Sequence, residues 1–495
     1  MKIHVAVISI ILALGAPVGA QEEHHHPAPE HLGTAHLVTS CALAVMLAFD
    51  RAVVLLHSFA YDEADMAFAD VVTRDPSCAL AHWGRAMTHY HQLWDVPVGA
   101  GLAAGIAEID QAETMATGTP REHALIAALG VYYGNVSQVP AAVRAMHYSD
   151  AMTVVARDYP TDDEIATFYA LSLIATAPPN DHTHTRQKRA ADILEPIWKR
   201  QPDHPGVPHY LIHAYDSAEL AQRGLPAARL YAKIAPSAPH ALHMPSHIFT
   251  RLGLWDDSIS SNIAAREAAR AQADVGEELH AMDYLTYAYL QRNRKSDAAA
   301  VVADLKAMTS LSGVGFKIGY AGNAMPVRLA VETRDWTTAS QLTPMPSSAP
   351  QVAAIVWWAR ALGELRATTP RSADSDITEL QTCREALRTA NDLYWMAQVD
   401  ALLQSAQAWR LLAAGKSGAA VAALTAAADE EDGLEKLPLT PGPVVPVREQ
   451  LGELYLIVGK PREALDAFNA TLALAPGRLG ALRGKAEAER RVNSP

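Results

Sequence analysis

Apolar and polar positions along most of the chain follow the spacing expected of paired α-helices. The segment "LGELYLIVGKPREALDAFNATLALAP" places small residues at Gly452 and Ala464, a large apolar residue at Phe468 and a closing proline at Pro476. Small residues let two helices cross closely, and a large residue fills the space between them. Proline ends a helix because it cannot supply the backbone N–H. The pattern predicts two helices joined by a short turn.

The same pattern occurs elsewhere in the chain. The segment "YDEADMAFADVVTRDP" has Ala64, Phe68 and Pro76 at the same offsets, and a third copy opens at Gly253 and places Ala265. Looser pairs are predicted over residues 79–118, 121–160, 161–202, 203–236 and 279–310. These landmarks resemble the tetratricopeptide repeat over most of residues 40–490. The resemblance implies an all-α, superhelical solenoid in which each helix pair buries its apolar face on its neighbours.

Breaks in the pattern fall at stretches rich in proline and serine. The segments "TPMPSSAP" (343–350), "TTPRSADSD" (368–376) and "LPLTPGPVVP" (437–446) are predicted to be loops between helix pairs, or to mark a boundary near 311–350.

The N-terminus has the pattern of a cleavable signal peptide over residues 1–20. Lys2 supplies a positive charge, an apolar run follows over 5–14, and small residues at Gly19 and Ala20 suit a signal peptidase. The apolar run is too short to span a bilayer. No later segment is predicted to cross a membrane. We therefore expect a secreted or periplasmic protein whose mature chain begins near Gln21.

The net charge excludes two classes of partner, and the cysteine content limits the disulfides. A net charge of −13 argues against nucleic acid and anionic membranes as partners. The 3 cysteines are too few to frame the fold. In an oxidising compartment we expect Cys41 to pair with Cys78, since both lie at the starts of adjacent helix pairs, leaving Cys383 single.

Histidine is distributed unevenly. All 21 histidines lie at or before His280. The chain is therefore divided into a histidine-rich N-terminal segment (21–36), a histidine-rich solenoid (37–310) and C-terminal repeats without histidine (311–495). This division predicts different roles, with the C-terminal repeats available to a protein partner.

In the tetratricopeptide family, the first helix of each pair lines a concave groove. Counting from the landmarks of each repeat places a set of polar residues at groove positions: His57, His89, His209, His213, Asp216, His247, His280, Asp283 and Tyr287. This groove is predicted to hold a small molecule or a peptide.

A metal site is predicted within the groove. In "HYLIH", His209 and His213 are spaced i,i+4, so both imidazoles project from one helix face. In "PHALHMPSHIFTRLG", Pro245 suits the first turn of a helix. His247 would then lie in that turn, with His240 and His243 on the loop that enters it. We expect His209, His213, His243 and His247 to share one ion, with the other groove residues and His240 as additional candidates.

These motifs resemble those of a subgroup of secreted bacterial tetratricopeptide proteins, which implies the fold and export but no reaction. Three or four histidines suit copper or zinc, and affinity alone favours copper. Two histidines with Asp216 or Asp283 would suit iron. The leading hypothesis is a metalloprotein, with oxidoreductase chemistry favoured over hydrolysis. The alternative is a non-catalytic, peptide-binding scaffold whose histidines recognise acidic groups or respond to pH.

Overall fold

The computed structural model describes residues 30–93, 96–309, 311, 315–436 and 439–494. Within these ranges the chain is all α with one short 3-10 turn and no strand, which confirms the fold class. The predicted signal peptide (1–20) lies outside the described residues, as does 21–29 of the N-terminal segment. None of the described helices combines the length and apolar character needed to cross a membrane. From His31 onward the chain forms one compact unit.

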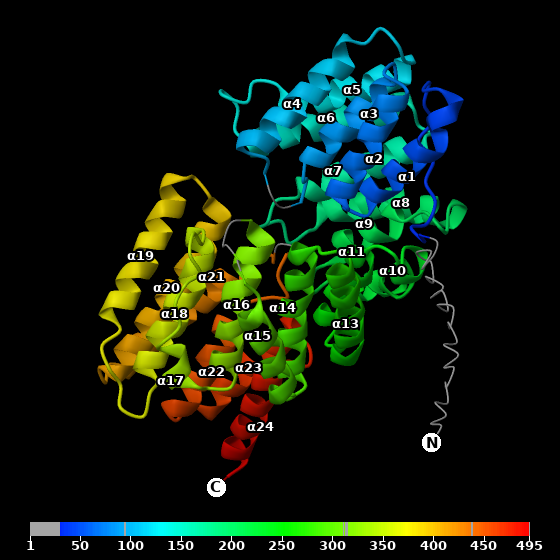
Figure 1. Ribbon diagram of the computed structural model, residues 1–495. Coiled ribbons are helices and arrows are strands. Elements are labelled where there is room, and N and C mark those ends of the chain that lie inside the picture. Colours follow the sequence, from blue (N-terminus) through cyan, green and yellow to red (C-terminus); the bar gives the residue numbers. More distant parts are fainter. Residues whose placement is uncertain (1–29, 94–95, 310, 312–314, 437–438, 495) are drawn as a thin grey trace, which may run out of the picture. The chain divides into compact units, whose positions relative to one another are not determined.

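The N-terminal helices follow one another as pairs (Figure 1). They are α1 (Met46–His57), α2 (Tyr61–Arg74), α3 (Ala79–His89), α4 (Gly99–Thr114), α5 (Pro120–Tyr133), α6 (Ala141–Asp158), α7 (Asp163–Ala175), α8 (Thr185–Arg200), α9 (Gly206–Tyr215) and α10 (Ala221–Ile234). The pairs α3–α4, α5–α6, α7–α8 and α9–α10 coincide with four of the looser pairs expected from the sequence.

The middle of the chain contains α11 (Pro239–His243), α12 (Pro245–Arg251), α13 (Trp255–Ala271), α14 (Val275–Gln291) and α15 (Lys295–Ala307). The C-terminal part contains α16 (Phe316–Glu332), α17 (Trp336–Ala339), α18 (Pro350–Leu365), α19 (Asp374–Thr389), α20 (Leu393–Ala413), α21 (Ser417–Asp432), α22 (Val447–Ile457), α23 (Pro461–Leu474) and α24 (Leu479–Asn493). The three predicted breaks fall at the joints α17/α18, α18/α19 and α21/α22, although residues 437–438 are outside the described ranges.

Close contacts between glycine and phenylalanine hold successive helices together. A Cβ atom added to Gly84 would lie 2.5 Å from the ring of Phe68, and one added to Gly452 would lie 2.7 Å from the ring of Phe468. Both phenylalanines are fully buried. Any larger residue at these glycines would push the helices apart. The small and large positions of the repeat pattern therefore make the packing contact that the sequence predicts.

The third predicted copy is out of register. Gly253 does not lie inside a helix but in the turn between α12 and α13, with φ at +68°. It corresponds to Gly459, the turn glycine between α22 and α23, with φ at +77°. A Leu-Gly pair suits both a helix crossing and a left-handed turn, so the local pattern could not separate the two. The groove position assigned to His247 from Gly253 is therefore wrong.

The predicted entry loop before Pro245 is also wrong. Pro239 occupies the first turn of α11, so His240 and His243 are helical residues. Met244 keeps helical dihedrals between α11 and α12, with φ −52° and ψ −36°. Two prolines are tolerated here because each one begins a helical segment. The three histidines of this stretch consequently project from nearly continuous helix.

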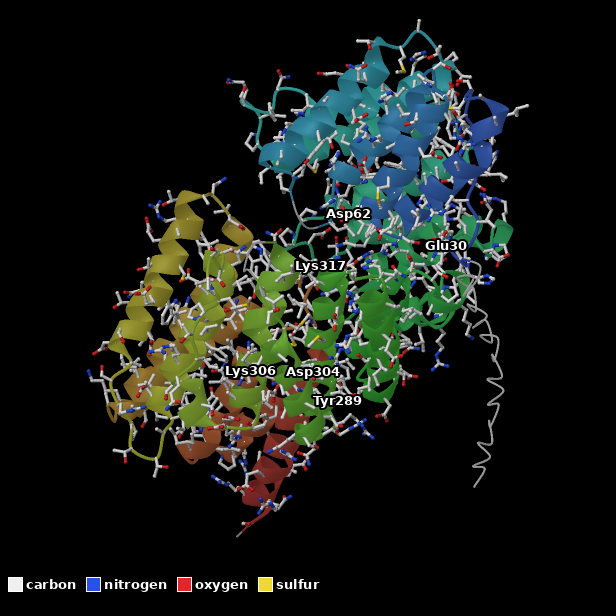
Figure 2. All side chains as sticks on the ribbon, viewed as in Figure 1. Glu30, Asp62, Tyr289, Asp304, Lys306 and Lys317 are labelled. Atoms are coloured by element: carbon white, nitrogen blue, oxygen red, sulfur yellow. A yellow bond between two sulfur atoms is a disulfide. The ribbon has the colours of Figure 1, made fainter. Side chains whose placement is uncertain are left out.

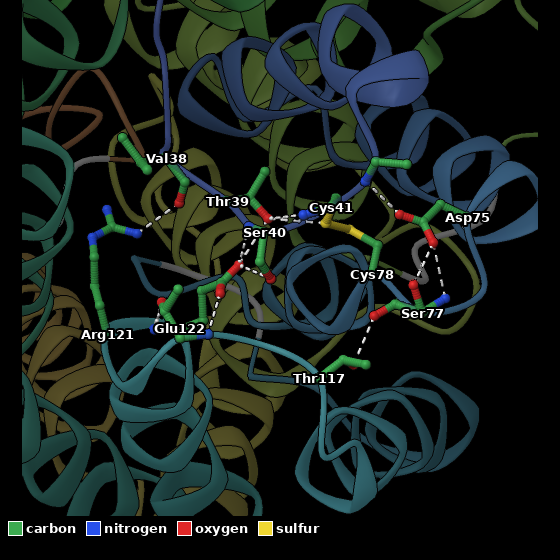
Figure 3. The surroundings of a disulfide bond; sticks show 12 residues. Val38, Thr39, Ser40, Cys41, Asp75, Ser77, Cys78, Thr117, Arg121 and Glu122 are labelled. Carbon is green, nitrogen blue, oxygen red and sulfur yellow. Dashed lines mark hydrogen bonds between the residues drawn. A yellow bond between two sulfur atoms is a disulfide. The ribbon is translucent and has the colours of Figure 1, made fainter.

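A disulfide joins Cys41, which precedes α1, to Cys78, the N-cap residue of α3, with their Cα atoms 4.7 Å apart (Figure 3). Figure 3 also shows Glu122 accepting hydrogen bonds from Thr39 and Ser40 beside the bridge. The predicted pairing of the two cysteines is present in the structure.

We expect one free thiol per chain, that of Cys383, when the denatured and unreduced protein is titrated with a thiol reagent. Replacing both Cys41 and Cys78 with serine should lower the free energy of unfolding by roughly 3–4 kcal/mol, because the bridge closes a long loop of the unfolded chain. A count of three free thiols would contradict the bridge, whereas urea unfolding measures the energetic effect.

Candidate metal centre

Six histidines from four helices meet in the interior of the described structure. They are His209 and His213 on α9, His240 and His243 on α11, His247 on α12 and His280 on α14, and none is more than 5% exposed. Helix α9 contacts α12, and α11 contacts α14. Figure 1 labels three of these helices, α9, α11 and α14, in shades of green. The predicted groove positions are therefore enclosed at this point, and the histidines do not line an open surface.

Cluster A consists of His209, His213 and His240, each of which offers a ring nitrogen within 4.8 Å of the other two. The Nε2 atom of His209 lies 3.1 Å from Nε2 of His213 and 3.2 Å from Nε2 of His240. Three imidazole nitrogens therefore converge on one small volume.

The outward nitrogens fix the tautomers in cluster A. Nδ1 of His209 lies 2.6 Å from the carbonyl oxygen of His57, which can only accept, so Nδ1 carries the proton. Nδ1 of His240 donates in the same way to Glu277, at 3.1 Å. In the neutral ring of His209, Nε2 consequently carries no proton. The single lone pair of His209 Nε2 can accept at most one hydrogen bond, yet it faces two neighbouring imidazoles.

Cluster B consists of His243, His247 and His280, whose ring nitrogens also converge within 4.8 Å. Nδ1 of His243 donates to the side-chain oxygen of Asn262 at 2.6 Å, and Nδ1 of His247 donates to Asp216 at 2.9 Å. The Nε2 atoms of His243 and His247 face each other at 3.0 Å. The ring of His280 lies 4.2 Å from that of His243, centroid to centroid.

Burial keeps these imidazoles neutral. It lowers the pKa of His247 to about 4 and holds the pKa values of four others well below 6.5, namely His209, His213, His243 and His280. Because His243 and His247 each carry their proton on Nδ1, no proton lies between their facing Nε2 atoms when both rings are neutral. Within the described part of the chain, Nδ1 of His213 is buried and has no hydrogen-bond partner. A metal ion would bind the facing lone pairs directly, because neutral imidazole nitrogen is a metal ligand.

A third cluster shows the opposite arrangement. Nε2 of His57 and Nε2 of His204 each donate to Glu164, both at 2.9 Å. Nδ1 of His57 accepts from the hydroxyl of Tyr210, and Nδ1 of His204 accepts from the N–H of Gly206. Every ring nitrogen has a complementary partner, so this cluster is a closed hydrogen-bond network. His57 thus supports cluster A through its carbonyl oxygen, and its ring is engaged elsewhere.

Two carboxylates accept hydrogen bonds from Nδ1 atoms of the clusters, Glu277 from His240 and Asp216 from His247. Asp216 accepts hydrogen bonds from His247, from Arg251 at 2.9 Å and from Lys436 at 2.9 Å. Burial opposes ionisation of Asp216, but these two cations hold its pKa well below the usual range. Glu277 likewise pairs with Lys317 of α16, which is labelled in Figure 2. Each carboxylate therefore orients an imidazole, as in carboxylate–histidine–metal arrangements.

The remaining predicted residues lie away from the two clusters. Asp283 pairs with the fully buried Arg328 at 2.8 Å, and the hydroxyl of Tyr287 accepts from Arg478 at 3.1 Å. His89 ends α3 and belongs to none of the clusters found among the described residues. The four histidines predicted to share one ion are divided between clusters A and B. Sequence reasoning did not single out His204 or Glu164, because neither has a local signal.

No family model and no curated protein matches the chain. Solved structures with similar architecture include yeast Tom70 (TM-score 0.35, 9% identity, covering 90% of this chain and 88% of that chain). They also include the APC/C hetero-tetramer Cut9-Hcn1 (TM-score 0.37, 12% identity, covering 93% of this chain and 78% of that chain). A third is the P58(IPK) TPR domain (TM-score 0.21, 11% identity, covering 91% of this chain and 98% of that chain). All are tetratricopeptide-repeat proteins. Likenesses this distant carry no functional argument, and the all-α class stands on the helix pairs described above.

Proposed function

We propose that the chain is an exported, tetratricopeptide-like metalloprotein that holds a transition metal on buried histidines between α9, α11, α12 and α14. The observation that carries the proposal is the meeting of Nε2 atoms at 3.0–3.2 Å, in rings of which four (His209, His240, His243 and His247) direct Nδ1 to a fixed acceptor. Export is supported by the sequence pattern of residues 1–20 alone.

The donor set favours copper over iron. Both candidate carboxylates for an iron site, Asp216 and Asp283, are occupied by buried arginine or lysine partners. Imidazole nitrogen then remains as the ligand type, which suits copper or zinc, and the affinity order of divalent metals favours copper. A copper ion on three imidazoles also suits oxidoreductase chemistry better than hydrolysis, because copper changes its oxidation state.

A protein partner for the C-terminal repeats is supported by a different observation. A cavity of about 610 Å³ is bordered by charged side chains of both signs, among them Glu332, Arg334, Arg366 and Arg483. Such a lining suits a polar peptide segment. This peptide-binding role is the second candidate function and is independent of the histidines.

The metal proposal is tested with His213→Ala in protein purified without a histidine tag. We expect the metal content from elemental analysis to fall strongly, while helical content from circular dichroism stays near wild type, because the substitution removes one imidazole and leaves the backbone hydrogen bonds of α9 in place.

The matched control is His204→Ala, which removes a buried histidine of the closed network. We expect it to retain full metal but to lose about 1–3 kcal/mol of stability, since Glu164 loses a hydrogen bond. The scaffold alternative predicts no stoichiometric metal in any of these proteins and equal melting with and without a chelator.

A further inference from the structure

We infer that clusters A and B form one dinuclear copper centre that binds dioxygen between its two ions. This inference rests on the proposed function and deepens it, since it specifies two ions, their ligands and the class of substrate.

The two clusters adjoin each other. Between clusters, the ring centroids of His213 and His247 lie 6.0 Å apart, and those of His240 and His243 lie 6.2 Å apart. Within cluster B, ring centroids are 4.2–6.2 Å apart. Neighbouring rings of different clusters are thus no farther apart than some rings that would share one ion. The two ion positions would then be adjacent, as in two-metal sites, where the ions lie roughly 3.5–4 Å apart.

One stretch of backbone supplies both clusters. His240 joins cluster A, whereas His243 and His247 join cluster B, and all three project from the nearly continuous helix of α11 and α12. Helix α9 completes cluster A with an i,i+4 pair, and α14 completes cluster B with His280. The spacing between the two ligand sets is consequently fixed by helix geometry.

The symmetry of the ligand sets favours a pair of redox ions. Each cluster offers three imidazoles, and each has one outer carboxylate, Glu277 for cluster A and Asp216 for cluster B. Three imidazoles leave a coordination position open on each ion. Copper accepts three nitrogen ligands in both of its oxidation states, so neither site has to rearrange when it gains or loses an electron.

A small cavity borders cluster A at His213. It has a volume of about 100 Å³ and is bordered by His213, Asp216 and Lys436 on one side and by apolar residues such as Ile174 and Pro178 on the other. A diatomic molecule fits such a space, whereas a peptide does not. Two Cu(I) ions would each donate one electron to dioxygen, which gives two Cu(II) ions and a bound peroxide without any proton transfer.

The test uses the full chain loaded anaerobically with Cu(I) and then exposed to dioxygen. We expect two copper ions per chain by elemental analysis and, after oxygenation, a nearly silent electron paramagnetic resonance spectrum, because the two Cu(II) spins couple. His213→Ala and His280→Ala should each hold one copper and, after chemical oxidation, give the full signal of one isolated Cu(II). Circular dichroism of these variants, and of His213→Gln and His280→Gln, tests whether a loss of copper comes from unfolding.

His147→Ala on α6 is the control, since His147 is exposed; it should behave as wild type. One copper per wild-type chain would overturn the dinuclear centre but leave the proposed function standing. Two coppers per chain whose electron paramagnetic resonance signal integrates to two isolated Cu(II) ions would have the same consequence. A wild-type chain that binds no copper would overturn the dinuclear copper centre, and one that binds no transition metal at all would overturn both.

Discussion

The metal-free protein is expected to lose most of its stability as the pH falls from 6.5 to 4. Five buried histidines have folded-state pKa values below 6.5, so at lower pH the unfolded chain binds protons that the folded chain cannot accept. The stability is intact above pH 6.5 and is lost as the pH falls. For His247, whose folded pKa is about 4, the loss reaches about 3 kcal/mol. Losses in the same direction at four more sites are large beside the roughly 5–15 kcal/mol of a typical domain.

Urea unfolding at several pH values, with a chelator present, measures this dependence. Uptake of one proton on unfolding lowers the free energy of unfolding by about 1.4 kcal/mol per pH unit, and the decrease below pH 6.5 should be steeper than that. His280→Leu should reduce that slope by about one proton, whereas His147→Ala should leave it unchanged. Stability that does not vary over this range would contradict the buried, neutral state of the imidazoles.

A bound metal ion should stabilise the folded chain at neutral pH. An ion that binds the folded chain alone stabilises it by about 2.7 kcal/mol at one hundred times its dissociation constant. Protons and metal compete for the same Nε2 atoms, so this added stability should itself fade on acidification.

The helix pairs could be predicted from sequence because their signals are local. Glycine, alanine, phenylalanine and proline recur at fixed spacing, and each acts on a helix that is its neighbour in the chain. Gly84 and Phe68 illustrate this, since they are 16 residues apart and make the contact that the pattern implies. The i,i+4 pair of His209 and His213 was recognised for the same reason.

The grouping of the histidines could not be predicted because it depends on how separate helices dock. Nothing near His280 indicates that it lies against His243 rather than beside Asp283. The register error at Gly253 arose because a leucine–glycine pair suits two conformations. The network of His57, Glu164 and His204 joins residues 107 and 40 positions apart, and such pairs carry no signature in either segment.

The division between a histidine-rich part and a histidine-free part has a related weakness. Lys436 lies in the histidine-free part, yet it donates to Asp216 from 220 residues away and so helps to hold His247. Lys317 does the same for Glu277 beside His240. Composition located the buried histidines, but Lys436 and Lys317, which pair with the carboxylates beside them, come from the other part of the chain.

Replacing Asp216 with alanine is expected to weaken both the fold and the metal centre. The substitution removes the acceptor of the His247 proton and leaves Arg251 and Lys436 without their shared carboxylate. Breaking a buried ion pair in this way typically costs about 3–5 kcal/mol. Losing the carboxylate that orients a ligating imidazole typically lowers metal affinity by about 10–100-fold. Asp216→Ala should therefore show a lower urea midpoint and a copper affinity reduced by that factor in competition with a chromogenic chelator.

The matched variant is Asp283→Ala, whose carboxylate is as buried as that of Asp216 and pairs with Arg328 outside both clusters. We expect a similar loss of stability, because a buried guanidinium is again left without its carboxylate, but an unchanged copper affinity. The comparison separates orientation of a ligand from general destabilisation. If both variants lose copper to the same extent, Asp216 acts only through the fold. If Asp216→Ala alone binds copper more weakly, the carboxylate positions His247 for the metal, and His247 belongs to the ligand set.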